Sequence, residues 1–98
     1  MPGIDDKSKS TGKKKSKFVD SSPALTTDFQ KIAVGFLGGD FVISNDSAKY
    51  IEYSWNGTKV DGKLLAGECI PESGVAQRDI WVRGEAGGEA YRIWISGE

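Results

Sequence analysis

Carboxylates are the side chains of this sequence with the widest range of possible chemistry. Residues 18–98 contain twelve Asp and Glu. A pair of them held about 5–9.5 Å apart across a cleft could hydrolyse a glycosidic bond, and a cluster could bind calcium. Most of them lie beside Gly or in predicted turns, where acidic residues serve turn geometry and solvation, and no EF-hand spacing is present. We therefore expect neither a metal site nor a catalytic carboxylate pair.

Nucleophilic chemistry is limited by the absence of His and by the presence of a single Cys. A Ser-His-Asp triad and a Cys-His pair both need His. One Cys permits neither an internal disulfide nor a Cys-cluster zinc site. Cys69 lies in the partly apolar run 64–70, where we expect it to be buried as a small apolar residue. The sequence thus predicts a protein that is not an enzyme and uses no cofactor.

Charge divides the chain into two parts. Residues 1–17 hold six Lys and two Asp, a net +4, whereas residues 18–98 hold seven basic and twelve acidic residues, a net −5. We expect a flexible Lys-rich arm over 1–24, since residues 7–17 contain no apolar side chain to bury, and a folded domain over 25–98. No apolar run approaches the roughly 20 residues of a membrane-spanning helix, and we expect no secretory signal and no membrane partner.

The arm supplies the first candidate partner-binding residues. They are Lys13, Lys14, Lys15, Lys17 and Phe18, and Phe18 and Val19 are the first side chains able to anchor the arm. Three interpretations stay open for the Lys cluster: a solvated tail, binding to an acidic protein surface, and binding to nucleic acid through phosphates.

Short strands and tight turns are predicted for the body, which holds eleven of the thirteen Gly. Residues 49–55 alternate with a period of two and end at Asn56-Gly57, a strong hairpin signal, so we expect a return strand over 58–60. Residues 27–38 fit either a helix or a strand, and we favour the strand because Gly35 weakens a helix interior. The predicted fold is all-β, a small antiparallel β-sandwich or barrel-like roll of six or seven strands.

A C-terminal hairpin supplies the second group of candidates. Residues 79–83 and 90–95 both alternate, and pairing them places two Trp and two Arg on the face opposite the Ile, Val and Tyr side chains. Trp and Arg are enriched at the energetic centres of protein interfaces. Either this face binds a partner, or the Trp rings lie in the core or stack on the Arg side chains. The four residues are Trp81, Arg83, Arg92 and Trp94.

The order of strands and turns resembles small β-sandwich virion proteins of tailed bacteriophages. The resemblance covers about residues 30–96 and is carried by 41–47 (FVISNDS), 51–57 (IEYSWNG), 62–68 (GKLLAGE), 80–84 (IWVRG) and 91–94 (YRIW). It implies a non-catalytic structural role in the virion, as a capsid decoration (cement) protein or as a neck or tail accessory protein. It also implies major capsid or tail protein subunits as partners and a homo-oligomer within the particle.

Two functions outside the virion class stay open. One is a nucleic-acid binding module that holds phosphates with its Lys-rich arm and stacks bases on Trp81 and Trp94, although an acidic body would repel the strand. The other is a carbohydrate-binding accessory domain that uses exposed Trp and Tyr side chains.

Overall fold

The computed structural model describes residues 14–98, and every regular element in that range is a β-strand. The expected all-β class is therefore confirmed. The same residues contain no helix long and apolar enough to cross a membrane. The strands are β2 (Lys15–Asp20), β3 (Gln30–Asn45), β4 (Ile51–Ser54), β5 (Gly62–Leu64), β6 (Cys69–Gly84) and β7 (Tyr91–Gly97).

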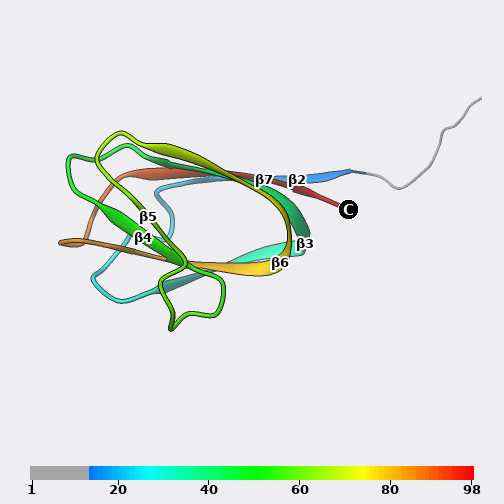
Figure 1. Ribbon diagram of the computed structural model, residues 1–98, viewed down its shortest axis with the longest axis horizontal. Helices are drawn as coiled ribbons and strands as arrows, with labels where there is room; N and C mark the ends of the chain where they lie inside the picture. Colours follow the sequence, from blue (N-terminus) through cyan, green and yellow to red (C-terminus); the bar gives the residue numbers. More distant parts are fainter. Residues whose placement is uncertain (1–13) are drawn as a thin grey trace, which may run out of the picture.

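The strands form one antiparallel sheet in the order β2-β7-β3-β6-β4-β5, and the sheet folds over on itself. β3 and β6 are 16 residues long and curve from one layer into the other (Figure 1). The second half of β3 pairs with the first half of β6 and with β7, and β7 pairs with β2. The first half of β3 pairs with the second half of β6, which also pairs with β4. The result is a two-layered roll built from a single sheet.

Glycine and irregular pairing produce the bend in both long strands. The β3–β6 register shifts between Ala33 and Gly38 and again before Asp40. Gly35 has a φ of 89° and Gly74 a φ of 68°, conformations that glycine adopts without steric cost. Residues 27–38, which fitted either a helix or a strand, thus include the start of β3. Their Gly residues allow β3 to bend from one layer into the other.

The core lies between the two layers and is filled by alternating side chains. Ile43, Ile93 and Phe41 come from one layer, and Ile80 and Val82 come from the other; all five are at most 1% exposed. The apolar face of the predicted C-terminal strands is thus the buried face. The other buried hydrophobic residues are Val19, Leu25, Ile32, Val34, Ile51, Tyr53, Leu64, Tyr91 and Ile95.

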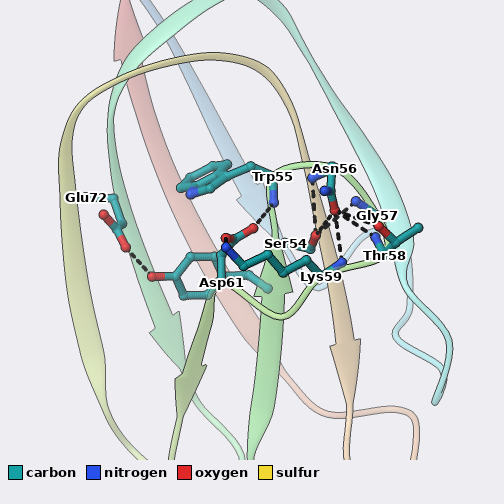
Figure 2. Close-up of polar contacts among 9 residues, drawn as sticks. Ser54, Trp55, Asn56, Gly57, Thr58, Lys59, Asp61 and Glu72 are labelled. Atoms are coloured by element: carbon teal, nitrogen blue, oxygen red, sulfur yellow. Dashed lines mark hydrogen bonds and ion pairs between the residues drawn. The ribbon is translucent and has the colours of Figure 1, made fainter.

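The return strand after Asn56-Gly57 was predicted in the wrong place. Residues 58–60 belong to a loop, and the strand that pairs with β4 is β5, with Leu64 opposite Ile51. Local polar contacts shape this loop (Figure 2). The Oδ1 atom of Asn56 accepts hydrogen bonds from the backbone N–H groups of Thr58 and Lys59, both at 2.9 Å. Asn56-Gly57 therefore does reverse the chain after β4. Hydrogen bonds to the Asn56 side chain hold the residues that follow in a loop instead of a return strand.

The sheet begins before the expected domain boundary at residue 25. β2 covers residues that we assigned to the arm, and it pairs with β7 from Lys15 opposite Gly97 to Asp20 opposite Arg92. Val19 is buried at 4% exposure and holds this strand on the core. The Lys-rich segment joins the fold through Val19 in the core, through the contact of Phe18 with Trp94, and through the backbone partners that β7 supplies. The expectation for residues 1–13 lies outside the described residues.

Cys69 was predicted to be buried and is exposed. It is the first residue of β6, opposite Ser44 on β3, and its neighbour Ile70 provides the side chain that faces the core.

Candidate interaction surface

An apolar row crosses the outer face of the layer formed by β2, β7, β3 and β6. Phe18 lies opposite Trp94, Trp94 opposite Val42, and Val42 opposite Pro71. These residues alternate with the buried Val19, Ile93 and Ile43, so their side chains point away from the core. The row therefore places four apolar side chains side by side on the surface of the molecule.

Polar rows border this apolar row on both sides. On one side Ser16, Ser96, Asp40 and Ser73 lie across the same four strands. On the other side the corresponding residues are Asp20, Arg92, Ser44 and Cys69. An apolar centre with a polar border is the usual anatomy of a protein–protein interface. We call the apolar row and its two borders the outer-face stripe.

Two exposed aromatic rings lie next to each other in the outer-face stripe. Phe18 is 54% exposed and Trp94 is 39% exposed, and their ring centres lie 5.4 Å apart. A pocket of about 320 Å³ lies beside them and is lined in part by Lys17, Asp40 and Val42. Large exposed aromatic side chains beside a shallow pocket are typical of sites that receive a side chain from a partner.

Arg92 fixes the other side of Trp94. Its guanidinium lies 5.0 Å from the centre of the Trp94 ring and donates hydrogen bonds to both carboxylate oxygens of Asp46, at 2.6 and 3.0 Å. These bonds lower the pKa of Asp46, against a smaller effect of burial, and the Ser44 hydroxyl lowers it further. The bidentate geometry keeps the guanidinium plane in place and orients the indole ring.

Trp81 and Arg83 lie in the opposite layer. Trp81 pairs with Lys31 on β3 and with Ser54 on β4, and the Lys31 Nζ atom lies 5.8 Å from its ring centre. Arg83 donates a hydrogen bond of 2.9 Å to Glu52 and lies 4.3 Å from the ring centre of Phe29. Both side chains are half-buried by contacts within the chain.

The prediction that Trp81, Arg83, Arg92 and Trp94 form one surface is therefore wrong. It required β6 and β7 to pair as a hairpin, but β3 lies between them in the sheet. Because the sheet folds over, Trp81 and Arg83 face one side of the molecule, whereas Arg92 and Trp94 face the other. Stacking of Trp on Arg, the alternative interpretation, is found for Arg92 and Trp94.

Alternation places the Lys candidates Lys15 and Lys17 on the face of β2 that carries Val19, and Lys17 also lines the pocket beside Phe18 and Trp94. Lys14 precedes β2, Lys15 and Lys17 lie within it, and all three are exposed. Lys13 lies outside the described residues. Phe18, predicted as an anchor of the arm, contacts Trp94 on the outer face.

Sequence reasoning missed Val42, Pro71 and Asp46. Val42 lies beside Trp94 only through the β3–β7 register, which no local pattern of the sequence shows. Among residues 14–98, no group of three or more His, Cys, Asp or Glu is placed to hold a metal ion.

Comparison with known proteins identifies a fold. No family model and no curated protein matches the chain. The crystal structure of the SPBc2 prophage-derived protein YomS is similar, with a TM-score of 0.56 and 13% sequence identity. The similarity covers 90% of this chain and 98% of that chain. At this level of identity the two proteins share the folded-over antiparallel architecture.

Proposed function

We propose that this chain is a non-catalytic structural protein of a bacteriophage virion, and that it decorates the assembled capsid. The observation that carries the proposal is the outer-face stripe, in which two exposed aromatic rings, Phe18 and Trp94, lie side by side in an apolar row with polar borders. A surface of this kind fits a protein partner better than it fits a small substrate. The fold shared with a prophage-derived protein supports a phage origin.

The major capsid protein is the proposed partner, and the Lys residues complete the contact. Lys14, Lys15 and Lys17 bring positive charge to the start of β2, the strand at the end of the outer-face stripe, whereas residues 18–98 carry a net −5. Lys17 also lines the pocket beside the two aromatic rings. Acidic side chains on the shell would attract this end of the stripe and orient the apolar row for docking. A partner inside a neck or tail would use the same surface, and the number of copies per particle separates these positions.

The number of copies per particle tests the proposal. Quantitative mass spectrometry of purified particles is expected to find copies in numbers comparable to the major shell protein. A dozen or fewer copies per particle would place the chain in the neck or tail. Absence from every particle would overturn the virion role, and binding of single-stranded DNA and of a glycan array would then be measured.

A matched pair of variants tests the docking surface. Trp94→Ala removes the centre of the outer-face stripe, and Trp81→Ala removes the same side-chain type from the opposite layer. We expect Trp94→Ala to lower attachment to particles at least tenfold and Trp81→Ala to leave it within about twofold. Thermal melting of both variants controls for folding. Equal attachment by two folded variants would show that another surface binds the shell.

A further inference from the structure

The outer edge of β2 offers backbone hydrogen-bonding groups at alternate residues. The backbone N–H of Ser21 donates to the carbonyl of Tyr91 at 2.9 Å, directly continuing the β2–β7 register. In an antiparallel ladder every second residue bonds to a given neighbour, so Val19, Lys17 and Lys15 bond to β7. Ser16, Phe18 and Asp20 consequently point their N–H and C=O groups away from β7.

The pairing on the other side of β7 agrees with this alternation. The Asp46 N–H donates a hydrogen bond to the Ala90 carbonyl at 3.0 Å, so the even-numbered residues of β7 form their backbone hydrogen bonds with β3. The backbone groups of its odd-numbered residues are therefore directed toward β2. β2 is the end strand of the sheet, and no strand among residues 14–98 covers its outer edge. A free edge with regularly spaced donors and acceptors is a template for an added strand.

We propose that a second copy of this chain pairs antiparallel along β2, with the two-fold axis passing between the two Phe18 residues. In this register Phe18 lies opposite the partner's Phe18, and Ser16 lies opposite the partner's Asp20. All of these are residues with outward N–H and C=O groups, so each opposed pair exchanges two backbone hydrogen bonds. The contact is isologous, as a two-fold axis requires.

Like-charge repulsion disfavours two alternative registers. With the axis at Phe18, Lys17 lies opposite the partner's Val19, and no like charges oppose each other. Moving the axis by one residue toward the N-terminus would place Lys17 opposite the partner's Lys17. Moving it to Asp20 would place the two Asp20 carboxylates opposite each other. Directly opposed like charges destabilise a strand pair. A third register, with the axis at Val19, opposes no like charges, but it places Phe18 opposite the partner's Asp20 instead of opposite the partner's Phe18.

The dimer extends the apolar row of the outer-face stripe into the second copy. Phe18 is 54% exposed in the single chain and would be covered by its counterpart. A contact along one six-residue strand is small, so we expect a dissociation constant on the order of micromolar. The inference concerns the isolated protein and does not depend on the proposed virion role.

A cysteine placed on the axis tests the register directly. In a Cys69→Ser background, Phe18→Cys places two sulfur-bearing residues opposite each other with Cα atoms about 5.5 Å apart, within the range of a disulfide. Mild oxidation is expected to convert most of the protein to a covalent dimer. Ser16→Cys in the same background is the control, because its Cα would lie about 14 Å from its symmetry mate, four residue steps along the strand and one strand across. Equal crosslinking of both variants, or none for Phe18→Cys, would overturn the register.

A pair of charge variants tests the contact without a crosslink. Phe18→Glu opposes two carboxylates on the axis, whereas Leu65→Glu adds the same charge at a residue that is 55% exposed and lies near β5. Analytical ultracentrifugation between about 10 and 500 µM is expected to show dimers for the parent and for Leu65→Glu, with at least tenfold weaker association for Phe18→Glu. A monomeric parent at the highest concentration, or a dimer insensitive to Phe18→Glu, would sink the proposal.

Discussion

The hydroxyl of Tyr53 on β4 donates a hydrogen bond to a carboxylate oxygen of Glu72 on the first half of β6, and so joins the two layers of the roll (Figure 2). β4 pairs with the second half of β6, and its backbone makes no pair with the first half. Side chains must therefore close the roll on this side. Tyr53 is 2% exposed, and the Trp55 ring lies 5.6 Å from its ring centre.

Removing the Tyr53 hydroxyl tests how much this link stabilises the fold. Tyr53→Phe keeps the ring but leaves the Glu72 carboxylate without its donor, and we expect a loss of about 1.5–3 kcal/mol in the free energy of unfolding. Glu72→Gln retains an oxygen that can accept the hydrogen bond, and its loss should be smaller. Urea unfolding of the three proteins measures both values. A Tyr53→Phe variant as stable as the parent would show that the roll closes without this bond.

Alkaline pH should destabilise the protein through buried tyrosines. Burial raises the pKa of Tyr91 to about 12, above the value near 10 of an unfolded chain. The folded state therefore holds this proton more tightly, and the resulting stability is present below pH 10 and is lost as the pH rises from about 10 to 12. Burial and the Glu72 carboxylate also raise the pKa of Tyr53, so both residues act in the same direction.

The Tyr91→Phe variant separates the contribution of that residue. It loses the 2.6 Å hydrogen bond from the Tyr91 hydroxyl to the Pro23 carbonyl, which should lower stability at pH 7 by about 1 kcal/mol. Between pH 10 and 12 its stability should fall less steeply than that of the parent, because one ionisation has been removed. Urea midpoints at several pH values measure this difference. Deprotonation of Lys in the same pH range affects the stability of both proteins equally and does not contribute to the difference. Parallel pH profiles would contradict the prediction.

Side-chain faces were predictable from the sequence, whereas strand neighbours were not. Alternation placed Ile80 and Val82 together on one face and Ile93 and Ile95 on another, and both faces are buried. Adjacent segments were expected to pair because chain neighbours commonly do. Here β3 lies between β6 and β7, and nothing local to residues 79–95 encodes that insertion.

The outer-face stripe depends on residues too far apart in the chain for local patterns to connect. Phe18 and Trp94 become neighbours only through the β2–β7 register. Patterns with a period of two identify which residues share a face of one strand, but they do not specify which strand lies beside it. The sequence could thus name Phe18 and Trp94 as candidates and could not join them into one surface.

Truncation tests where the fold begins. A protein lacking residues 2–13 keeps all of β2, whereas a protein lacking residues 2–17 loses its first half, which pairs with Ile95, Ser96 and Gly97. We expect the longer deletion to be less stable than the shorter one by about 1–3 kcal/mol, since Ile95 loses cover and the β7 backbone loses partners. Urea unfolding of the two proteins gives the difference directly. Equal stability would place the start of the stabilising fold after Lys17.

Asn45 ends β3 and is fully buried, so it should be one of the polar residues most sensitive to substitution. Its Nδ2 group lies within 2.7–3.1 Å of the backbone carbonyls of Lys49, Leu64 and Leu65. Its Oδ1 atom accepts hydrogen bonds from the backbone N–H and the hydroxyl of Ser47. One side chain thus holds the β3–β4 turn against the end of β5.

Asn45→Ala should lower the free energy of unfolding by about 2–4 kcal/mol, because it leaves buried carbonyls without donors and creates a small cavity. Asn56→Ala is the matched control, since the Asn56 side chain organises an exposed loop by the same type of contact. Water can replace that side chain, and the expected loss is below about 1 kcal/mol. Urea unfolding ranks the two variants. Equal losses would mean that loop order, rather than burial of the amide, determines the energetic effect of these asparagines.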